Sequence, residues 1–219
     1  MTVLLPGPPA PFRESLVHDG WPVELFVHTD ATVDHWLAMD RERRRPTLGR
    51  LIGEGRVLLD VEGAGAAVAA RCRAFLAAGP EPLSDNDRDA LRYGITDLLD
   101  DLADALDPAV RAAVAVELWQ QAADLLLAGG GAWGGSGKWR VRELASYDEA
   151  HRTRFGPRLY GGLAAAVRGD PGPLTRVTDE VLAGSGGRLW AGYRASGRIE
   201  TEDGTGDDEV SGPGRPAGP

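Results

Sequence analysis

The sequence predicts an α+β fold that is mostly helical, with a small N-terminal sheet packed on a C-terminal helical bundle. Two patterns support this prediction. The first 30 residues show strand alternation around an Asp-Gly turn, and residues 32–183 repeat apolar side chains at helical spacing between glycine and proline stops. A sheet of two or three short strands is marginal alone, so we expect the helices to cover it.

Strands are expected at 1–5, 13–18 and 21–29, with a short fourth strand at 57–60. Asp19-Gly20 favours a hairpin between the second and third strands. Ser84 is a good N-cap, and Pro108 suits the first turn of a helix. Helices are expected at 32–44, 47–54, 65–78, 84–106, 109–128, 140–151, 156–168 and 173–183.

These elements divide the chain into a sheet with its helices at 1–62, a helical bundle at 63–194 and a tail at 195–219. The tail is acidic, rich in glycine and proline, and has no aromatic residue. Such a segment cannot bury enough apolar area to offset its ordering entropy, so we expect it to be disordered.

Composition narrows the function classes. The net charge is −9, from 33 acids against 24 Lys and Arg, which disfavours a nucleic acid or an anionic membrane as partner. No run reaches the roughly 18 apolar residues of a membrane span, and the N-terminus has no basic leader. Cys72 is the only cysteine, so no intramolecular disulfide can form. We expect a cytoplasmic protein, and a homodimer is left open.

The third expected strand has an acid, Glu24, at a position where a buried apolar side chain is expected. Alternation places Val23, Leu25 and Val27 on one face, and Glu24 with Phe26 and His28 on the other. The other interpretation of Glu24 is an ordinary exposed residue on a half-covered sheet. The four histidines show no metal-finger spacing.

Two basic segments are candidates for phosphate binding. Arginines at 41 and 43–45 end a helix, where they favour the negative end of its dipole, but their mutual repulsion would also be relieved by a triphosphate. Residues 132–139 are similar to a P-loop but fail its pattern, since Ala132 and Trp139 replace the required Gly and Ser or Thr. What remains is a flexible loop with Lys138 between two tryptophans, either a plain connection or a nucleotide contact.

A row of polar residues follows the helix at 84–106. Tyr93, Asp97, Asp100 and Asp104 share one side, with Asp101 at its margin. A solvated face explains such a row. The alternative is that Asp97 or Asp101 binds a cationic acceptor or acts as general base on its hydroxyl.

Taken together, five segments resemble a bacterial nucleotidyltransferase of the polymerase-beta superfamily over roughly 1–194. They are Pro-Phe-Arg-Glu-Ser at 11–15, Trp-Pro-Val-Glu-Leu-Phe-Val-His-Thr at 21–29, Arg-Arg-Arg-Pro-Thr at 43–47, Arg-Tyr-Gly-Ile-Thr-Asp-Leu-Leu-Asp-Asp-Leu at 92–102 and Gly-Ser-Gly-Lys-Trp at 135–139.

The resemblance implies that Glu24 is the third metal carboxylate. Together with the segments described above, the expected site has Glu24, Asp97 and Asp101 as catalytic residues. Arg43, Arg44 and Lys138 are expected to bind nucleotide, and Tyr93, Asp100 and Trp139 to bind the acceptor. The resemblance also implies Mg²⁺-dependent transfer of a nucleoside monophosphate from a nucleoside triphosphate to a small-molecule hydroxyl.

The family's Gly-Ser turn and Asp-x-Asp pair have no counterpart before the first strand. Two-metal catalysis needs several carboxylates, so we expect this chain to be inactive, either because it starts late or because it is a degenerate member. The alternative function is a non-catalytic ligand-binding or protein-interaction module. A helical ribonuclease toxin is excluded, because no Arg precedes a His by four to six residues in a helix.

Overall fold

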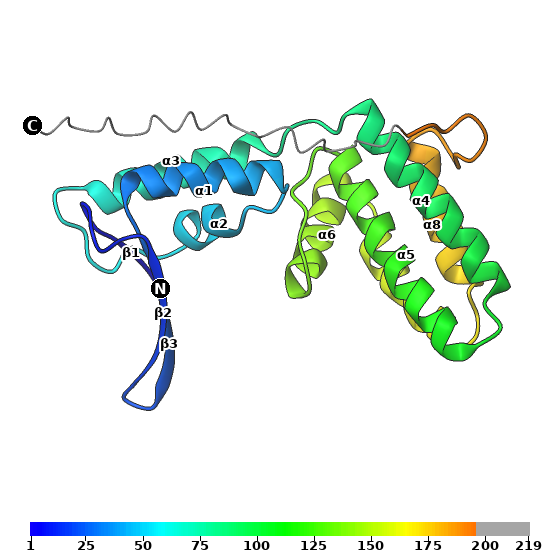
Figure 1. The fold of residues 1–219 in the computed structure, drawn as a ribbon, viewed down its shortest axis with the longest axis horizontal. Helices are drawn as coiled ribbons and strands as arrows, with labels where there is room; N and C mark the ends of the chain where they lie inside the picture. The colour runs from blue at the N-terminus through cyan, green and yellow to red at the C-terminus, as the bar shows by residue number, and fades with distance from the viewer. Residues whose placement is uncertain (196–219) are drawn as a thin grey trace, which may run out of the picture.

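The structure, a computed structural model, describes residues 1–195 and confirms an α+β fold that is mostly helical (Figure 1). Three strands precede eight helices in these residues. The strands are β1 (Thr2–Leu4), β2 (Phe12–His18) and β3 (Trp21–His28). The helices are α1 (Asp30–Glu42), α2 (Thr47–Gly53), α3 (Ala64–Ala78), α4 (Asp85–Asp104), α5 (Pro108–Gly129), α6 (Lys138–His151), α7 (Phe155–Val167) and α8 (Gly172–Gly184).

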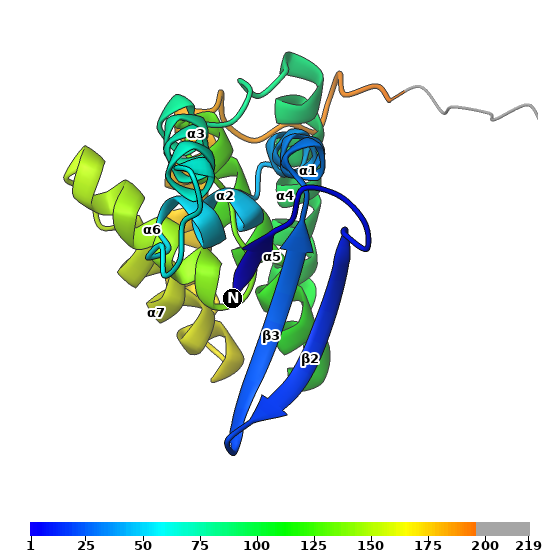
Figure 2. The ribbon, with the colours of Figure 1, turned by 90° about the vertical axis from the view of Figure 1, so that its left-hand side faces the viewer.

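The sheet has the order β1-β3-β2, with β1 parallel and β2 antiparallel to β3. The hairpin turn is the predicted one: Asp19 and Gly20 have φ values of 49° and 80°. Positive φ at both turn residues matches the twist of the flanking strands. The β2–β3 hairpin projects away from α1, α2 and α3 (Figures 1 and 2).

Local capping fixes where several helices begin. Thr29 and Thr32 form a capping box, so α1 starts two residues before the predicted 32. Ser84 caps α4 as predicted, since its side chain accepts a hydrogen bond from the Asp87 amide. Asp107 caps α5, because its side chain accepts hydrogen bonds from the amides of Ala109 and Val110, and Pro108 lies in the first turn.

The predicted strand at 57–60 is wrong. These residues are irregular, and Val57, Leu58 and Leu59 are exposed. Asp60 explains the outcome, because its carboxylate accepts hydrogen bonds from the amides of Gly65 and Ala66 at the start of α3. The segment therefore leads into a helix and does not pair with the sheet.

Two hydrophobic clusters form the core. The smaller, which we call the first cluster, lies between α1, α2 and α3 and consists of Val33, Leu37, Leu48, Val68, Cys72, Phe75 and Trp133. The larger, the second cluster, joins residues of α4, α5, α6, α7 and α8. Helix α3, which we assigned to the bundle segment 63–194, thus packs with the N-terminal elements. Separate domains stay a prediction, and the predicted tail lies outside the described residues apart from Ala195.

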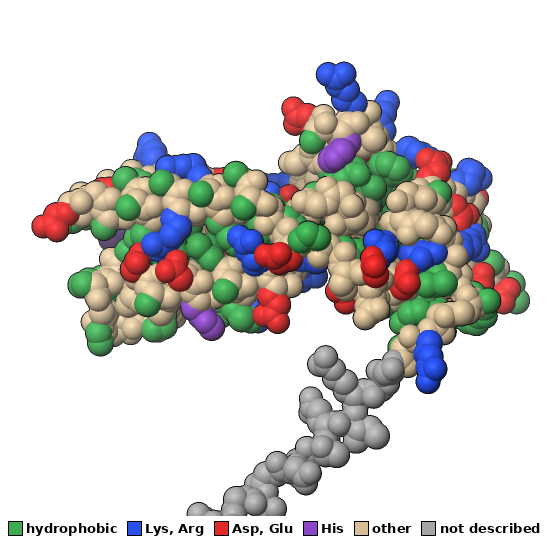
Figure 3. Space-filling model, turned by 90° about the horizontal axis from the view of Figure 1, so that it is seen from above, with side chains coloured by type: hydrophobic (Ala, Val, Ile, Leu, Met, Phe, Trp, Pro, Cys, Tyr) green, Lys and Arg blue, Asp and Glu red, His purple; other side chains and the backbone are tan. Residues whose placement is uncertain are grey.

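The loop after α5 is hydrogen-bonded to the N-terminal elements. The indole of Trp133 donates to the Leu76 carbonyl at 2.9 Å, and the Gly134 amide donates to the Arg44 carbonyl at 2.8 Å. Within residues 1–195, no helix combines the length and the apolar character needed to cross a bilayer. Side chains of both signs are interspersed over the face seen in Figure 3.

Candidate functional site: an arginine pocket at the junction

A pocket of about 340 Å³ lies where the turn after α1 meets α4, α5 and the loop after α5. We call it the arginine pocket. Six of its lining residues are charged, three cations and three anions. It is lined by Glu42, Arg43, Arg44, Arg45, Leu83, Asp87, Leu91, Asp124, Ala128, Ala132 and Gly134.

The chain turns sharply to present these arginines. Helix α1 ends at Glu42, and Arg44 adopts a left-handed φ of 53°. The Arg45 amide donates a hydrogen bond to the Asp40 carbonyl at 2.9 Å. Pro46 has no amide hydrogen with which to continue the helix. Three consecutive arginines are therefore gathered at the end of α1.

The three arginines differ in what they bind. The Arg44 guanidinium donates to the carbonyls of Glu81 and Pro82, so it holds the linker before α4. Arg43 and Arg45 are exposed and, within residues 1–195, make no side-chain hydrogen bond or ion pair. The pocket thus has two uncommitted guanidinium groups.

Two of the three acids that line the pocket accept hydrogen bonds, and the third, Glu42, is exposed. Asp124 accepts from the Arg140 guanidinium, with Nη2 at 3.1 and 3.0 Å from its two oxygens, and Arg140 is only 4% exposed. Burial raises the pKa of the Asp124 carboxyl, while Arg140 and then Arg45 oppose that rise. Asp87 accepts from the Ser84 hydroxyl at 2.6 Å. With Asp124 paired to Arg140, three arginines remain beside two acids, Asp87 and Glu42, so the pocket keeps a small excess of positive charge that favours an anion.

Glu24 lies elsewhere and does not fit a magnesium ion as it stands. Its carboxylate pairs with the Arg13 guanidinium, whose Nε donates at 2.9 Å, and Arg13 in turn lies over the Phe26 ring. In residues 1–195 no group of three or more His, Cys, Asp or Glu side chains could hold a metal ion. At 1.5 Å per residue, α1 separates β3 from the arginines by roughly 20 Å.

The predicted acceptor residues on α4 stay together but outside the arginine pocket. Tyr93 stacks on Trp190 and Tyr193, with ring centroids 5.3 and 4.3 Å apart. Asp100 lies 3.7 Å from Arg188, from its oxygen to a guanidinium nitrogen. Asp97 and Asp101 are exposed. Residues after α8 therefore cover part of this face of α4. Helix α4 and strand β3 are far apart in Figure 1.

Lys138 and Trp139 form the first turn of α6. Lys138 is exposed, and Trp139 is half-buried between two guanidinium groups, with Arg142 at 4.7 Å and Arg50 at 5.7 Å from its ring centroid. Neither residue lines the arginine pocket. The Trp139 ring helps to join α2 to α6.

Sequence reasoning missed Asp124 and Arg140. Asp124 stands in a helix with alanine and leucine on almost every face, and Arg140 follows a loop for which the sequence pointed only to Lys138 and the two tryptophans. The available signal was the acid itself, because a carboxylate in a largely apolar helix requires a partner when it is buried.

The chain matches no model of a known protein family and no curated protein. Among solved structures it is similar to a nucleotidyltransferase-like protein from Exiguobacterium sibiricum 255-15, with 13% identity and a TM-score of 0.33. The similarity covers 84% of this chain and 63% of that protein, so this chain spans less than two thirds of its length. A likeness this distant leaves the function to be inferred from the residues of this chain.

Proposed function

We propose that the arginine pocket binds the phosphate groups of a nucleoside triphosphate, as in a protein of the nucleotidyltransferase kind. The observation that carries the proposal is the pair Arg43 and Arg45, which line the pocket and, within residues 1–195, make no side-chain hydrogen bond or ion pair, while Arg140 pairs with Asp124. Planar guanidinium groups match the oxygen geometry of phosphate, and charge-assisted hydrogen bonds are the stronger kind.

The size of the pocket agrees with this role. About 340 Å³ lies at the lower end of the range of small-molecule sites, enough for a polyphosphate group. Arg44 and Arg140 contribute indirectly: Arg44 fixes the linker wall, and Arg140 pairs with Asp124. Binding would therefore require little rearrangement.

The chemical step is proposed from the resemblance of the sequence alone. On the resemblance of the segments at 11–15, 21–29, 43–47, 92–102 and 135–139, the protein would transfer a nucleoside monophosphate to a small-molecule hydroxyl with Mg²⁺. We assign Glu24 no part in this transfer, because its carboxylate is paired with the Arg13 guanidinium. The magnesium ion would enter with the triphosphate.

A non-catalytic ligand-binding module is the second candidate. The observation in its favour is that Glu24 and the arginine pocket are separated by the length of α1, so binding does not require the metal site. Both candidates share the phosphate site and differ in turnover of the bound nucleotide.

The test is thermal unfolding with ATP, GTP, CTP, UTP and inorganic tripolyphosphate, each with and without Mg²⁺, because a ligand of the native state raises the melting temperature. We expect the double variant Arg43→Gln, Arg45→Gln to weaken binding at least about tenfold, since each hydrogen bond to a charged group contributes about 1.5–3 kcal/mol. Arg56→Gln, at an exposed arginine outside the pocket, is the matched control.

Two results would contradict the proposal. One is the absence of any shift with all five ligands from a protein that unfolds cooperatively. The other is a shift that the double variant retains in full. Release of pyrophosphate with a hydroxyl acceptor would support the transferase, whereas binding without turnover would support the binding module.

A further inference from the structure

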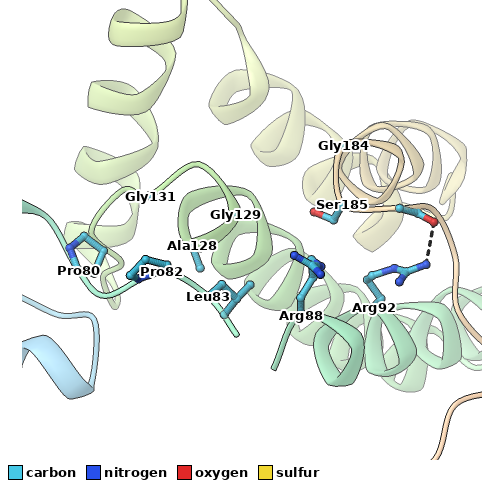
Figure 4. Close-up of a pocket in the computed structure, with 11 residues that line it drawn as sticks. Pro80, Pro82, Leu83, Arg88, Arg92, Ala128, Gly129, Gly131, Gly184 and Ser185 are labelled. Carbon is cyan, nitrogen blue, oxygen red and sulfur yellow. Dashed lines mark hydrogen bonds between the residues drawn. The ribbon is translucent and has the colours of Figure 1, made fainter. Parts of the chain in front are cut away.

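A second pocket of about 540 Å³ lies beside the arginine pocket, and we call it the glycine pocket. The linker before α4 forms one side of it, and α4 and the turn after α8 form the other (Figure 4). Its lining is mostly small or apolar. It consists of Pro80, Pro82, Leu83, Arg88, Arg92, Ala128, Gly129, Gly131, Gly184, Ser185 and Gly186.

The walls of the glycine pocket are held in place. Arg92 donates from Nε to the Gly187 carbonyl at 2.9 Å and from Nη2 to the Gly186 carbonyl at 2.7 Å. These bonds fix the turn after α8 against α4. On the opposite side, Arg44 holds the linker through the carbonyls of Glu81 and Pro82. The cavity is thus built by directed contacts from both sides.

The glycine and arginine pockets are neighbours. Leu83 and Ala128 line both of them, so the two spaces are adjacent at these two side chains. Arg44 belongs to the arginine pocket and fixes the linker that walls the glycine pocket. One ligand with an anionic end and a larger, less charged end would therefore reach both.

The chemistry of the glycine pocket suits a ring system with polar edges. Pro80, Pro82 and Leu83 give an apolar wall, and Ser185 brings a hydroxyl to the other side (Figure 4). The Arg88 guanidinium is planar and pairs with Asp85 on its own helix. Because the Asp85 side chain is 86% exposed, that ion pair contributes little and is readily exchanged for a ligand.

We propose that the glycine pocket binds the nucleoside part of the same triphosphate whose phosphates contact Arg43 and Arg45. The base lies against the prolines and Leu83, and Arg88 and Ser185 contact its polar edge or the ribose. This inference rests on the proposed function and deepens it. It assigns both ends of one ligand to two pockets that share a wall.

Gly129 offers a substitution that fills the cavity without straining the fold. It is the last residue of α5, and a Cβ built there meets only the Ser185 hydroxyl, at 3.6 Å, an ordinary contact. Leucine also favours a helix more than glycine does. Gly161→Leu is the matched control, because Gly161 lies on the exposed side of α7 with no atom within 4 Å of its Cβ position.

The experiment measures the dissociation constants of tripolyphosphate and of ATP, GTP, CTP and UTP by calorimetry on the wild-type chain and the variants. We expect at least one nucleoside triphosphate to bind more tightly than tripolyphosphate. Gly129→Leu should weaken the binding of that triphosphate at least about tenfold and leave the binding of tripolyphosphate unchanged. Arg88→Gln should weaken the binding of the triphosphate by a smaller factor. Gly161→Leu should change neither ligand.

The outcomes separate the two proposals. If the Arg43, Arg45 double variant no longer binds either ligand while Gly129→Leu binds both as the wild-type chain does, the phosphate site is supported and the nucleoside site is refuted. A wild-type chain that binds all triphosphates no better than tripolyphosphate refutes it as well. So does a Gly129→Leu variant that loses tripolyphosphate equally, because the substitution would then act on the phosphate site.

Discussion

The N-terminal elements and the helical bundle achieve stability in different ways. The bundle of α4 to α8 has a large core of leucine and alanine from all five helices. The elements from β1 to α3 have the small first cluster and a sheet whose strand β2 is exposed along most of its length. The first cluster is completed by Trp133, which comes from the loop after α5. The N-terminal elements therefore depend on the bundle for part of their core.

This difference explains where the arginine pocket forms. Contacts that attach the dependent part to the bundle must lie at the junction, and they place Arg43 and Arg45 beside α4 and α5. Arg44 and Trp133 make the hydrogen bonds that attach the two parts, whereas Arg43 and Arg45 remain available for a ligand. A site at such a junction is sensitive to how the two parts are attached.

The largest expected effect comes from removing the shared side chain. Trp133 is 6% exposed and lies against Phe75, with ring centroids 4.9 Å apart. Trp133→Ala should lower the free energy of unfolding by about 3–5 kcal/mol, through the cavity and the lost hydrogen bond to Leu76. Denaturant unfolding measures the loss.

Trp21→Ala is the control for Trp133→Ala. Trp21 is 75% exposed at the start of β3, so the substitution should lower the free energy of unfolding by less than about 0.5 kcal/mol. Limited proteolysis of Trp133→Ala should cleave first between residues 1 and 82. If cleavage began in the bundle, the N-terminal elements would not be the dependent part.

The second prediction tests what the N-terminal elements supply themselves. Asp40 is 8% exposed, and its carboxylate accepts from the amides of Leu48, at 2.7 Å, and Gly49. It caps α2 from α1. Asp40→Ala should cost about 2 kcal/mol, because two buried amides lose their acceptor. Asp40→Asn keeps an acceptor oxygen and should recover about half of that in thermal unfolding. An equal loss in both variants would mean that the charge matters and the cap does not.

Local signals in the sequence were sufficient for most of the fold. Asp19-Gly20, Ser84 and Asp107-Pro108 each determine a turn or a helix start by themselves, and the structure has all three. The strand expected at 57–60 failed because the role of Asp60 as a cap for α3 is a contact with later residues. Helix boundaries are local, whereas strand pairing requires a partner that periodicity does not identify.

The candidate site was less predictable for the same reason. The cluster at 43–45 was found from charge alone, but which arginine is structural depends on the linker carbonyls that Arg44 contacts. Asp124 and Arg140 are 16 residues apart and are brought together by the packing of α5 on α6. The proposed roles of Glu24, Asp97, Asp101 and Lys138 stay predictions.

The third prediction concerns the edge of the bundle. Tyr93 holds the segment after α8 by stacking on Trp190 and Tyr193, and that segment is outside the second cluster. Tyr93→Leu should cost about 1 kcal/mol, as expected for aromatic pairs beyond their buried area. The melting temperature measures it. A loss above about 3 kcal/mol would show that this segment is as essential as the core, and the bundle would then be less self-sufficient than we describe.

The smallest effect concerns the ion pair that joins the two parts. Glu143 on α6 is 5% exposed and pairs with Arg50 on α2 at 2.5 Å. Burial raises the pKa of the Glu143 carboxyl above its ordinary 4.5, and Arg50 opposes that rise. Between the ordinary and the raised pKa the folded protein holds the proton more tightly than the unfolded chain, so stability from this group falls as pH rises through that window.

Glu143→Gln removes this titration and should make unfolding less dependent on pH. The stability advantage of the wild-type chain over the variant should shrink as pH rises from the ordinary 4.5 through the raised pKa of Glu143, by about 1.4 kcal/mol for each tenfold difference in proton affinity between folded and unfolded chains. Glu149→Gln, at an exposed acid on the same helix, is the control. An advantage that instead grows with pH would mean that Arg50 outweighs burial, so that this ion pair, and not Trp133 alone, attaches the N-terminal elements to the bundle.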